Sequence, residues 1–263
     1  MSETMILDLE TIPDFELIRT VGNYVSRFDD DTIYRDFVTQ RVKAGKSEFL
    51  PPPYHQVVSA GIVYRDSSGL SSCAYGNGPT RTEITRFSEK SIIERVAQYF
   101  EREPNLVTFN GSGFDLSVLV YRAMKNKVSL GKLCWKGGRG RGGQDFKWNN
   151  YMARFHDRHI DLMDELALFN GGSKVSLNVQ CNLVGIPGKL DTSGSQVLYL
   201  YKDGQYERID KYVLDDCAST YGMFLHYLLT FGKISEDEFR IEFNRLLNIC
   251  SDEWRQAYET RKT

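Results

Sequence analysis

The sequence predicts an α/β fold in which helices pack on both faces of a mixed β-sheet. Short apolar, β-branched segments dominate the first part of the chain, and later short strands alternate with amphipathic helices. From about residue 208 onward the pattern is mainly helical, which predicts a helical C-terminal portion. Strands that come first and then alternate with helices are typical of a sheet covered by helices. With 263 residues, of which 41% are hydrophobic, the chain can bury a sizeable core in one domain.

The first part of the chain contains three predicted strands and one insertion. The first strand is MILDLE, and we expect Pro13 in the following TIPD to break it. Residues 14–48 are charged and helical in pattern, and Pro51-Pro52-Pro53 follows them, so we predict a helical insertion over about 14–53. HQVVSAGIVYRD and SSCAYGNG, joined by SSGL, then predict an antiparallel pair of strands.

The next segments alternate between helix and strand. SEKSIIERVAQYFERE predicts an amphipathic helix that Ser88 or Ser91 caps. NLVTFNG predicts a short buried strand that leads into the helix DLSVLVYRAMKNK, and RHIDLM predicts a further strand. Residues 131–150 separate these elements and have the composition of a glycine-rich basic loop.

The overall composition excludes several classes of protein. The net charge is −2, from 33 basic and 35 acidic residues, so nucleic-acid binding would depend on local patches. The five cysteines include no C-x-x-C pair, which disfavours a disulfide framework and a zinc site. The sequence shows no signal peptide and no apolar run of membrane-spanning length, so we expect a soluble, cytoplasmic protein with no membrane partner.

Two carboxylates occupy the first predicted strand. Asp8 and Glu10 are two residues apart, so their side chains point to the same face. Carboxylates this close on a shielded face repel each other, and a divalent cation such as Mg²⁺ or Mn²⁺ relieves the repulsion. The alternative is a strand end whose polar face meets water.

Two later segments carry further candidate residues. Asp115 follows Asn110 and Phe114 at a predicted strand-to-helix turn, where it is either a site residue or an ordinary first-turn acid. Tyr212 and Asp216 are four residues apart on one face of a late helix. The alternative for this pair is the charged turn of an ordinary amphipathic helix.

In this order, the three motifs resemble those of the DEDD superfamily of 3′–5′ exonucleases, on a ribonuclease H-like fold with a mixed five-stranded sheet. The Y-x-x-x-D motif is typical of the proofreading domains of family B DNA polymerases, and the chain is similar to stand-alone predicted exonucleases related to those domains. The resemblance runs from residue 5 to about 224. It is carried by LDLETIPD, PPPYHQVVSAGIVY, RHIDLMDELALF, SLNVQCNLVGIPGKLDTSGSQV and YVLDDCASTYGMF.

The resemblance implies a two-metal phosphodiester hydrolysis. Asp8, Glu10, Asp115 and Asp216 would hold two Mg²⁺ or Mn²⁺ ions, and Tyr212 would orient the attacking water. The substrate would be a single-stranded 3′ end, with DNA favoured over RNA, and the products nucleoside 5′-monophosphates. We expect one exonuclease domain over 1–263, without a polymerase domain. The alternatives are a non-catalytic nucleic-acid-binding module and a structure-specific endonuclease on the same fold.

A second assignment of the last motif competes with Tyr212 and Asp216. His156 and Asp161 have the H-x-x-x-x-D spacing of the histidine branch of the superfamily. In that superfamily, however, elements resembling RHIDLM and VSLNVQCNLVGIP precede the last motif. The tyrosine assignment fits this order, and Asp161 is then a helper near the site or the cap of the next helix.

Gripping a single strand requires cations and stacking aromatic side chains. The basic loop interleaves both kinds, although it could equally be a mobile surface loop whose aromatic residues pack on the core. The candidate nucleic-acid contacts are Thr11, Asn110, Phe114, Lys136, Arg139 and Arg141.

Overall fold

The computed structural model describes residues 2–78, 86–138, 143–188 and 194–262, and the described strands form one five-stranded sheet. Its order is β3-β2-β1-β4-β5, so the first strand of the chain is the central one. β2 is antiparallel to both β1 and β3, whereas β4 is parallel to β1 and to β5. The strands are β1 (Thr4–Pro13), β2 (His55–Asp66), β3 (Gly69–Gly76), β4 (Asn105–Thr108) and β5 (His159–Asp161).

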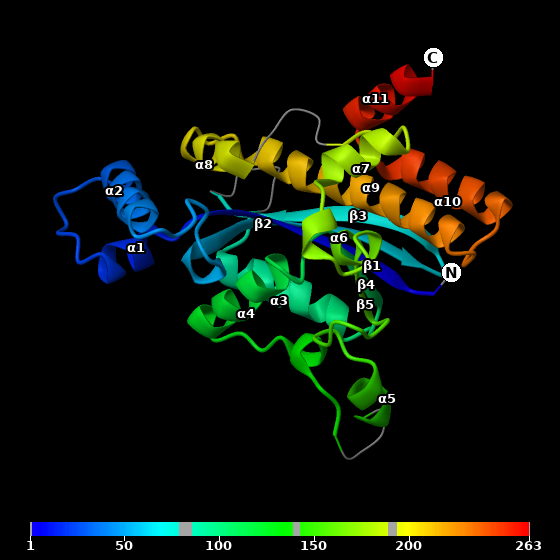
Figure 1. The fold of residues 1–263 in the computed structure, drawn as a ribbon, viewed down its shortest axis with the longest axis horizontal. Helices are drawn as coiled ribbons and strands as arrows, with labels where there is room; N and C mark the ends of the chain where they lie inside the picture. The colour runs from blue at the N-terminus through cyan, green and yellow to red at the C-terminus, as the bar shows by residue number, and fades with distance from the viewer. Residues whose placement is uncertain (1, 79–85, 139–142, 189–193, 263) are drawn as a thin grey trace.

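Helices cover both faces of this sheet, which confirms the predicted α/β architecture (Figure 1). One face packs against α3 (Glu89–Phe100) and α4 (Asp115–Asn126), and the other against α9 (Tyr206–Thr230) and α10 (Glu236–Ile249). β1 alternates between the two layers, because Met5, Leu7 and Leu9 belong to the α3–α4 core and Ile6 to the α9–α10 core. The remaining helices are α1 (Phe15–Val21), α2 (Asp30–Lys43), η1 (Pro52–Tyr54), η2 (Gly131–Cys134), α5 (Gly143–Trp148), α6 (Leu162–Leu166), η3 (Gly171–Ser173), α7 (Leu177–Leu183), α8 (Gly194–Lys202) and α11 (Asp252–Lys262).

β1 continues to Pro13, so the expectation that TIPD breaks the strand is wrong. The register with β2 shifts between Glu10 and Thr11, which marks an irregularity of the β-bulge kind. β4 pairs only with Thr4–Ile6, so no strand among the described residues pairs with the far end of β1 on that side. Proline is tolerated at such an edge because its missing N–H removes no ladder bond.

The insertion (residues 14–53) forms α1 and α2, which lie to one side of the sheet (Figure 1). It has a small core of its own, formed by Ile18, Ile33, Phe37 and Leu50. The side chain of Asp14 caps α1 by accepting the Leu17 N–H at 3.0 Å. This helical segment therefore has its own packing, as its charged, helical pattern predicts.

A buried ionic group joins the insertion to the sheet and to both helices of one layer. Arg122 of α4 donates through Nε and Nη2 to the two carboxylate oxygens of Glu89 on α3, each at 2.6 Å. Arg122 also pairs with Asp14 at the end of β1, and Glu89 accepts the Val57 N–H of β2 at 2.8 Å. This group therefore holds the second half of α4 at a fixed spacing from α3, β2 and the end of β1.

Residues 131–150 are more structured than a loop. They contain η2 and α5, and Phe146 of α5 and the later Tyr151 are only 1% exposed and pack on the α3–α4 core. This packing is the alternative given above for the aromatic residues, although Trp148 is 70% exposed. Lys136 is exposed, and Arg139 and Arg141 lie outside the described residues. Among the helices that the structure describes, none is long and apolar enough to cross a membrane.

Candidate active site

Asp8 and Glu10 point from the central strand toward the layer that contains α9. Their neighbours Met5, Leu7 and Leu9 face the opposite layer, so the two acids share a face by the alternation of the strand. Asp8 is partly buried, and Glu10 is only 9% exposed. The pair is therefore shielded from water rather than part of a solvated strand end.

Asp216 of α9 completes a group with the two strand acids. Ligand oxygens of Asp8, Glu10 and Asp216 all lie within 4.8 Å of one another. The charges of this group reach Cys217, whose buried thiol has a raised pKa because of burial and, secondarily, because of the carboxylates of Asp8 and Asp216. Three acids from the two ends of the chain thus concentrate negative charge at one point.

A glycine allows α9 to approach the sheet this closely. Gly61 of β2 is the register partner of Asp8. A Cβ atom at Gly61 would lie 2.8 Å from the backbone oxygen of Val213 and 3.0 Å from Sγ of Cys217, both on α9. The missing side chain therefore sets the distance between α9 and the sheet beside Asp8.

A second contact fixes α9 along its length. Asp210 accepts a hydrogen bond from the Ser59 hydroxyl of β2 at 2.7 Å and pairs with Arg86. Burial raises the pKa of Asp210, while the bonds to Ser59 and Arg86 oppose the rise. The neighbouring acid Asp215 points elsewhere, to the Ser251 hydroxyl at 2.6 Å, and burial raises its pKa to about 6.

Asp115 reaches the site from the opposite layer, past the end of β4. Asp115 is 4% exposed, and its Oδ1 accepts the N–H of Leu9 at 3.1 Å. Leu9 lies between Asp8 and Glu10 in the sequence. Because β4 ends at Thr108, the Asp115 carboxylate, rather than a strand carbonyl, accepts this N–H at the edge of β1. The N-cap of α4 is Phe114, so Asp115 is a first-turn acid whose side chain serves the strand.

The turn that presents Asp115 is held by Asp161. Asp161 accepts backbone N–H groups from Asn110 at 2.8 Å, Ser112 at 2.9 Å and Met163 at 3.1 Å. Asn110 adopts a φ of 65°, a left-handed conformation that asparagine tolerates better than most residues. Asp161 therefore shapes the turn and caps α6, and it is not one of the three clustered acids.

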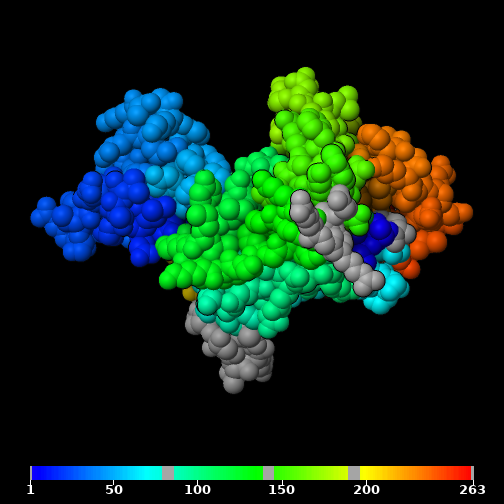
Figure 2. Space-filling model, turned by 90° about the horizontal axis from the view of Figure 1, so that it is seen from below, coloured from blue at the N-terminus to red at the C-terminus, as the bar shows by residue number. Residues whose placement is uncertain are grey.

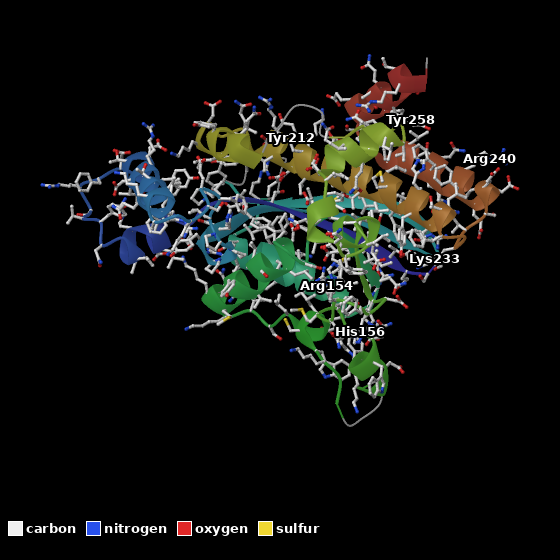
Figure 3. All side chains as sticks on the ribbon, in the orientation of Figure 1. Arg154, His156, Tyr212, Lys233, Arg240 and Tyr258 are labelled. Atoms are coloured by element: carbon white, nitrogen blue, oxygen red, sulfur yellow. The ribbon has the colours of Figure 1, made fainter. Side chains whose placement is uncertain are left out.

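Tyr212 and His156 lie far apart in the molecule. Figure 3 shows Tyr212 on α9 above the sheet and His156 below it. Nδ1 of His156 accepts the Asn150 N–H at 2.9 Å, in an irregular segment rather than a helix. Tyr212 is one helical turn before Asp216, so it is the residue that shares an element with the clustered acid.

Arg208 was not predicted from the sequence as a site residue. Its Nη2 donates to the Tyr212 hydroxyl at 2.8 Å, and its guanidinium lies 5.8 Å from the centre of the Tyr212 ring. Arg208, Tyr212 and Asp216 follow one another at intervals of four on α9. That interval is the signal in the sequence that could have found Arg208.

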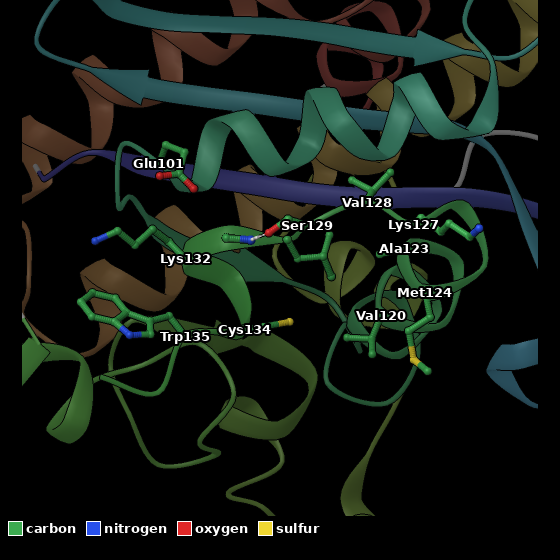
Figure 4. Close-up of a pocket in the computed structure, with 12 residues that line it drawn as sticks. Glu101, Val120, Ala123, Met124, Lys127, Val128, Ser129, Lys132, Cys134 and Trp135 are labelled. Atoms are coloured by element: carbon green, nitrogen blue, oxygen red, sulfur yellow. Dashed lines mark hydrogen bonds between the residues drawn. The ribbon is translucent and has the colours of Figure 1, made fainter. Parts of the chain in front are cut away.

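Pockets elsewhere on the molecule do not include the acids. A hollow of about 700 Å³ is lined by Val120, Met124, Lys127 and residues 128–132 and 134–135, with Trp135 at one end (Figure 4). A second cavity of about 700 Å³ starts at Ser112 and Gly113, in the turn before Asp115, and extends to Arg154 and Lys174. The two cavities share Val120 and Met124 of α4 in their linings, and the second reaches the turn that precedes Asp115.

A comparison with one solved structure agrees with this architecture. A family B DNA polymerase from the hyperthermophilic archaeon Pyrobaculum calidifontis matches with a TM-score of 0.51 and 18% identity, over 88% of this chain and 25% of the polymerase chain. This chain therefore spans about a quarter of that polymerase. Exonuclease I matches with a TM-score of 0.34 and 13% identity, over 71% of this chain and 32% of that one. No curated protein matches the chain.

One family model matches most of the sequence. It is described as a predicted 3′–5′ exonuclease related to the exonuclease domain of PolB, and it covers residues 47–261. Asp115, Tyr212 and Asp216 lie within the match, whereas Asp8 and Glu10 precede it. The chain has a ribonuclease H-like α/β fold and belongs to the family of predicted 3′–5′ exonucleases related to the exonuclease domain of PolB.

Proposed function

We propose that this protein is a metal-dependent 3′–5′ exonuclease that shortens single-stranded DNA from its 3′ end and releases nucleoside 5′-monophosphates. The observation that carries the proposal is the convergence of Asp8, Glu10 and Asp216 within 4.8 Å, with Asp115 beside them at the Leu9 N–H. The family supports 3′–5′ polarity, and the acids support the hydrolytic chemistry.

The residues fit divalent cations. Carboxylate oxygens are hard donors that suit Mg²⁺ and Mn²⁺, and three of them this close, largely buried, repel one another without a cation. Asp8, Glu10, Asp115 and Asp216 would hold two such ions. When bound, the ions would acidify water and stabilise the charge that develops on the leaving 3′ oxygen.

The protein's own groups then position the reactants. Tyr212 accepts a hydrogen bond from Arg208, so the tyrosine oxygen is held in place and its own proton is available to a water or a phosphate oxygen. Arg208 is exposed, and its charge also attracts the phosphate backbone. Asp161 keeps the 110–114 turn in shape and thereby keeps Asp115 next to Leu9.

A hollow in the surface has room for a single strand. Figure 2 shows a notch between the lobe of the insertion and the lobe formed by the α6–α7 region. The cavity that starts at Ser112 and Gly113 has Arg154 and Lys174 in its lining, and Arg154 stacks 5.1 Å above the ring of Phe169. Cations combined with aromatic rings are typical of single-strand binding surfaces.

The test is digestion of 5′-labelled single-stranded DNA and RNA with Mg²⁺, Mn²⁺ or EDTA. We expect stepwise 3′ shortening of DNA with metal and none with EDTA. Asp8→Asn and Asp216→Asn should each abolish cleavage while the circular dichroism spectrum is unchanged. Asp237→Asn is the matched control, because Asp237 is an exposed acid on α10 that pairs with Arg240, and it should retain full activity.

Three results would contradict the proposal. Undiminished metal-dependent cleavage by both variants would show that these acids are not the site. Cleavage of circular single strands would indicate an endonuclease. Tight binding without cleavage under any metal condition would indicate a non-catalytic binding module.

A further inference from the structure

Three aromatic rings pack together beside the site acids, and the chemistry proposed above leaves them without a role. They are Phe49 from the end of the insertion, His55 from the start of β2 and Phe114 from the turn before α4. The ring centroids are 5.2 Å apart for Phe49 and His55, 5.4 Å for Phe49 and Phe114, and 4.8 Å for His55 and Phe114. We call these three residues the aromatic platform.

The aromatic platform is held rigidly. Nε2 of His55 donates to the carbonyl of Leu50 at 2.9 Å, because a carbonyl can only accept, so Nδ1 accepts the Thr11 hydroxyl at 2.9 Å. Burial lowers the pKa of His55, which keeps the ring neutral in this arrangement. Leu50 is 3% exposed in the core of the insertion, so its neighbour Phe49 has a fixed position relative to β1.

The aromatic platform lies at the open edge of the central strand. Thr11, which bonds to His55, directly follows Glu10. Phe114 directly precedes Asp115, whose carboxylate contacts the Leu9 N–H. Since β4 pairs only as far as Ile6, no described strand lies beside this part of β1 on that side. A nucleotide at the acids would therefore have the aromatic platform next to it.

Phe49 differs from the other two rings in its exposure. It remains 62% exposed although it contacts two rings, so much of its surface faces water. An ordinary packing residue would be buried, and an exposed aromatic ring held in a fixed orientation suits the face of a nucleobase. The insertion that carries Phe49 also forms one wall of the notch in Figure 2.

We propose that Phe49 is the surface on which the base of the 3′-terminal nucleotide stacks, which makes the insertion part of the substrate site. This inference rests on the proposed exonuclease function and adds to it the residue that holds the terminal base. Stacking tolerates all four bases, because every base has a π-face, so the contact would grip the 3′ end without sequence preference.

The experiment compares two 5′-fluorescein single strands in EDTA, one complete and one lacking only its 3′-terminal base. Stacking contributes about 1–3 kcal/mol per base, so the wild-type protein should bind the complete strand about 5- to 150-fold more tightly. Phe49→Ala should bind the complete strand more weakly and lose most of the difference between the two strands. Phe49→Trp should restore it, because it keeps an aromatic face.

The matched control is Phe28→Ala, another aromatic residue of the same insertion, which is 39% exposed and has Arg27 over its ring. It should behave as wild type toward both strands. A 2-aminopurine at the 3′ end gives a second readout, since stacking quenches its fluorescence, and the quench should be lost only in Phe49→Ala.

The outcomes separate this inference from the proposed function. If the wild-type protein neither binds nor shortens single strands, the proposed function fails. If it does both, and Phe49→Ala loses equal affinity for the two strands or matches Phe28→Ala, the stacking role of Phe49 is refuted while the exonuclease proposal stands.

Discussion

Replacing Gly61 by alanine should move α9 away from the sheet and damage the site without touching an acid. The added Cβ would lie 2.8 Å from the Val213 backbone oxygen, and an ordinary contact starts near 3.4 Å, so α9 must shift by roughly 0.6 Å. Overpacking of this kind costs about 1–3 kcal/mol of unfolding free energy. Since metal–ligand distances tolerate only about 0.2 Å, Asp216 on the shifted helix should bind metal poorly.

The assay follows unfolding in urea and kcat at increasing Mn²⁺ concentration. We expect Gly61→Ala to have a kcat roughly 10-fold lower than wild type and to require more metal, since misplacing a catalytic group by 1 Å costs about 100-fold. Gly171→Ala is the control, because no atom lies within 4 Å of the position that its Cβ would occupy. Normal activity and metal dependence in Gly61→Ala would refute the view that close approach of α9 at Gly61 assembles the site.

Three further predictions concern groups around the site. Arg122→Met should cost about 3–5 kcal/mol in urea unfolding, because it takes the guanidinium away from two buried carboxylates, Asp14 and Glu89, of which Asp14 keeps its ion pair with Lys125. Burial alone would raise the pKa of Asp14, but hydrogen bonds from Lys125 and Arg122 outweigh it and lower the pKa below 3.8. The stability from this pairing is thus present above pH 3.8 and is lost as the pH falls through the lower pKa of the folded state, so Asp14→Asn should flatten the loss of stability on the acid side of pH 3.8. Tyr212→Phe should lower kcat by about 100-fold with little change in KM, and Arg208→Ala should lower it less.

Each of these predictions has a result that contradicts it. A loss below about 1 kcal/mol in Arg122→Met would mean that water or neighbouring groups compensate the two carboxylates. An unchanged acid limb in Asp14→Asn would remove that residue from the acid response. For Tyr212→Phe, a higher KM at constant kcat would indicate a substrate-binding role instead.

Most of the element order was predictable because the sheet strands and the longer helices have local signals of their own. Ser88 caps α3, one of the two candidates that the sequence offered, and α4 begins at Asp115 as its apolar period indicates. The extent of β1 was not predictable, because Pro13 is tolerated only where β4 stops early. The point at which β4 stops pairing with β1 is set by residues about 100 positions away in the sequence, and the local sequence of β1 does not indicate it.

In the candidate site, too, local features were predictable from the sequence and long-range distances were not. The interval between Asp8 and Glu10 places them on one face, but their distance from Asp216 depends on Gly61, a residue without any chemistry. The basic loop contains η2 and α5, which its glycine-rich composition does not indicate, and Phe146 of α5 is buried in the core. Sequence patterns identify which residues carry charge, and tertiary packing decides which of them meet.

Asp115 makes the edge of the central strand and the chemistry of the site inseparable. Its carboxylate accepts the Leu9 N–H, which would donate to β4 if that strand were longer. Alanine at position 115 would therefore leave this backbone N–H without its hydrogen-bond acceptor and would also remove a charge. Asparagine keeps an oxygen there and removes only the charge. A descendant of this protein that gave up catalysis but kept its fold would therefore be expected to carry asparagine at 115.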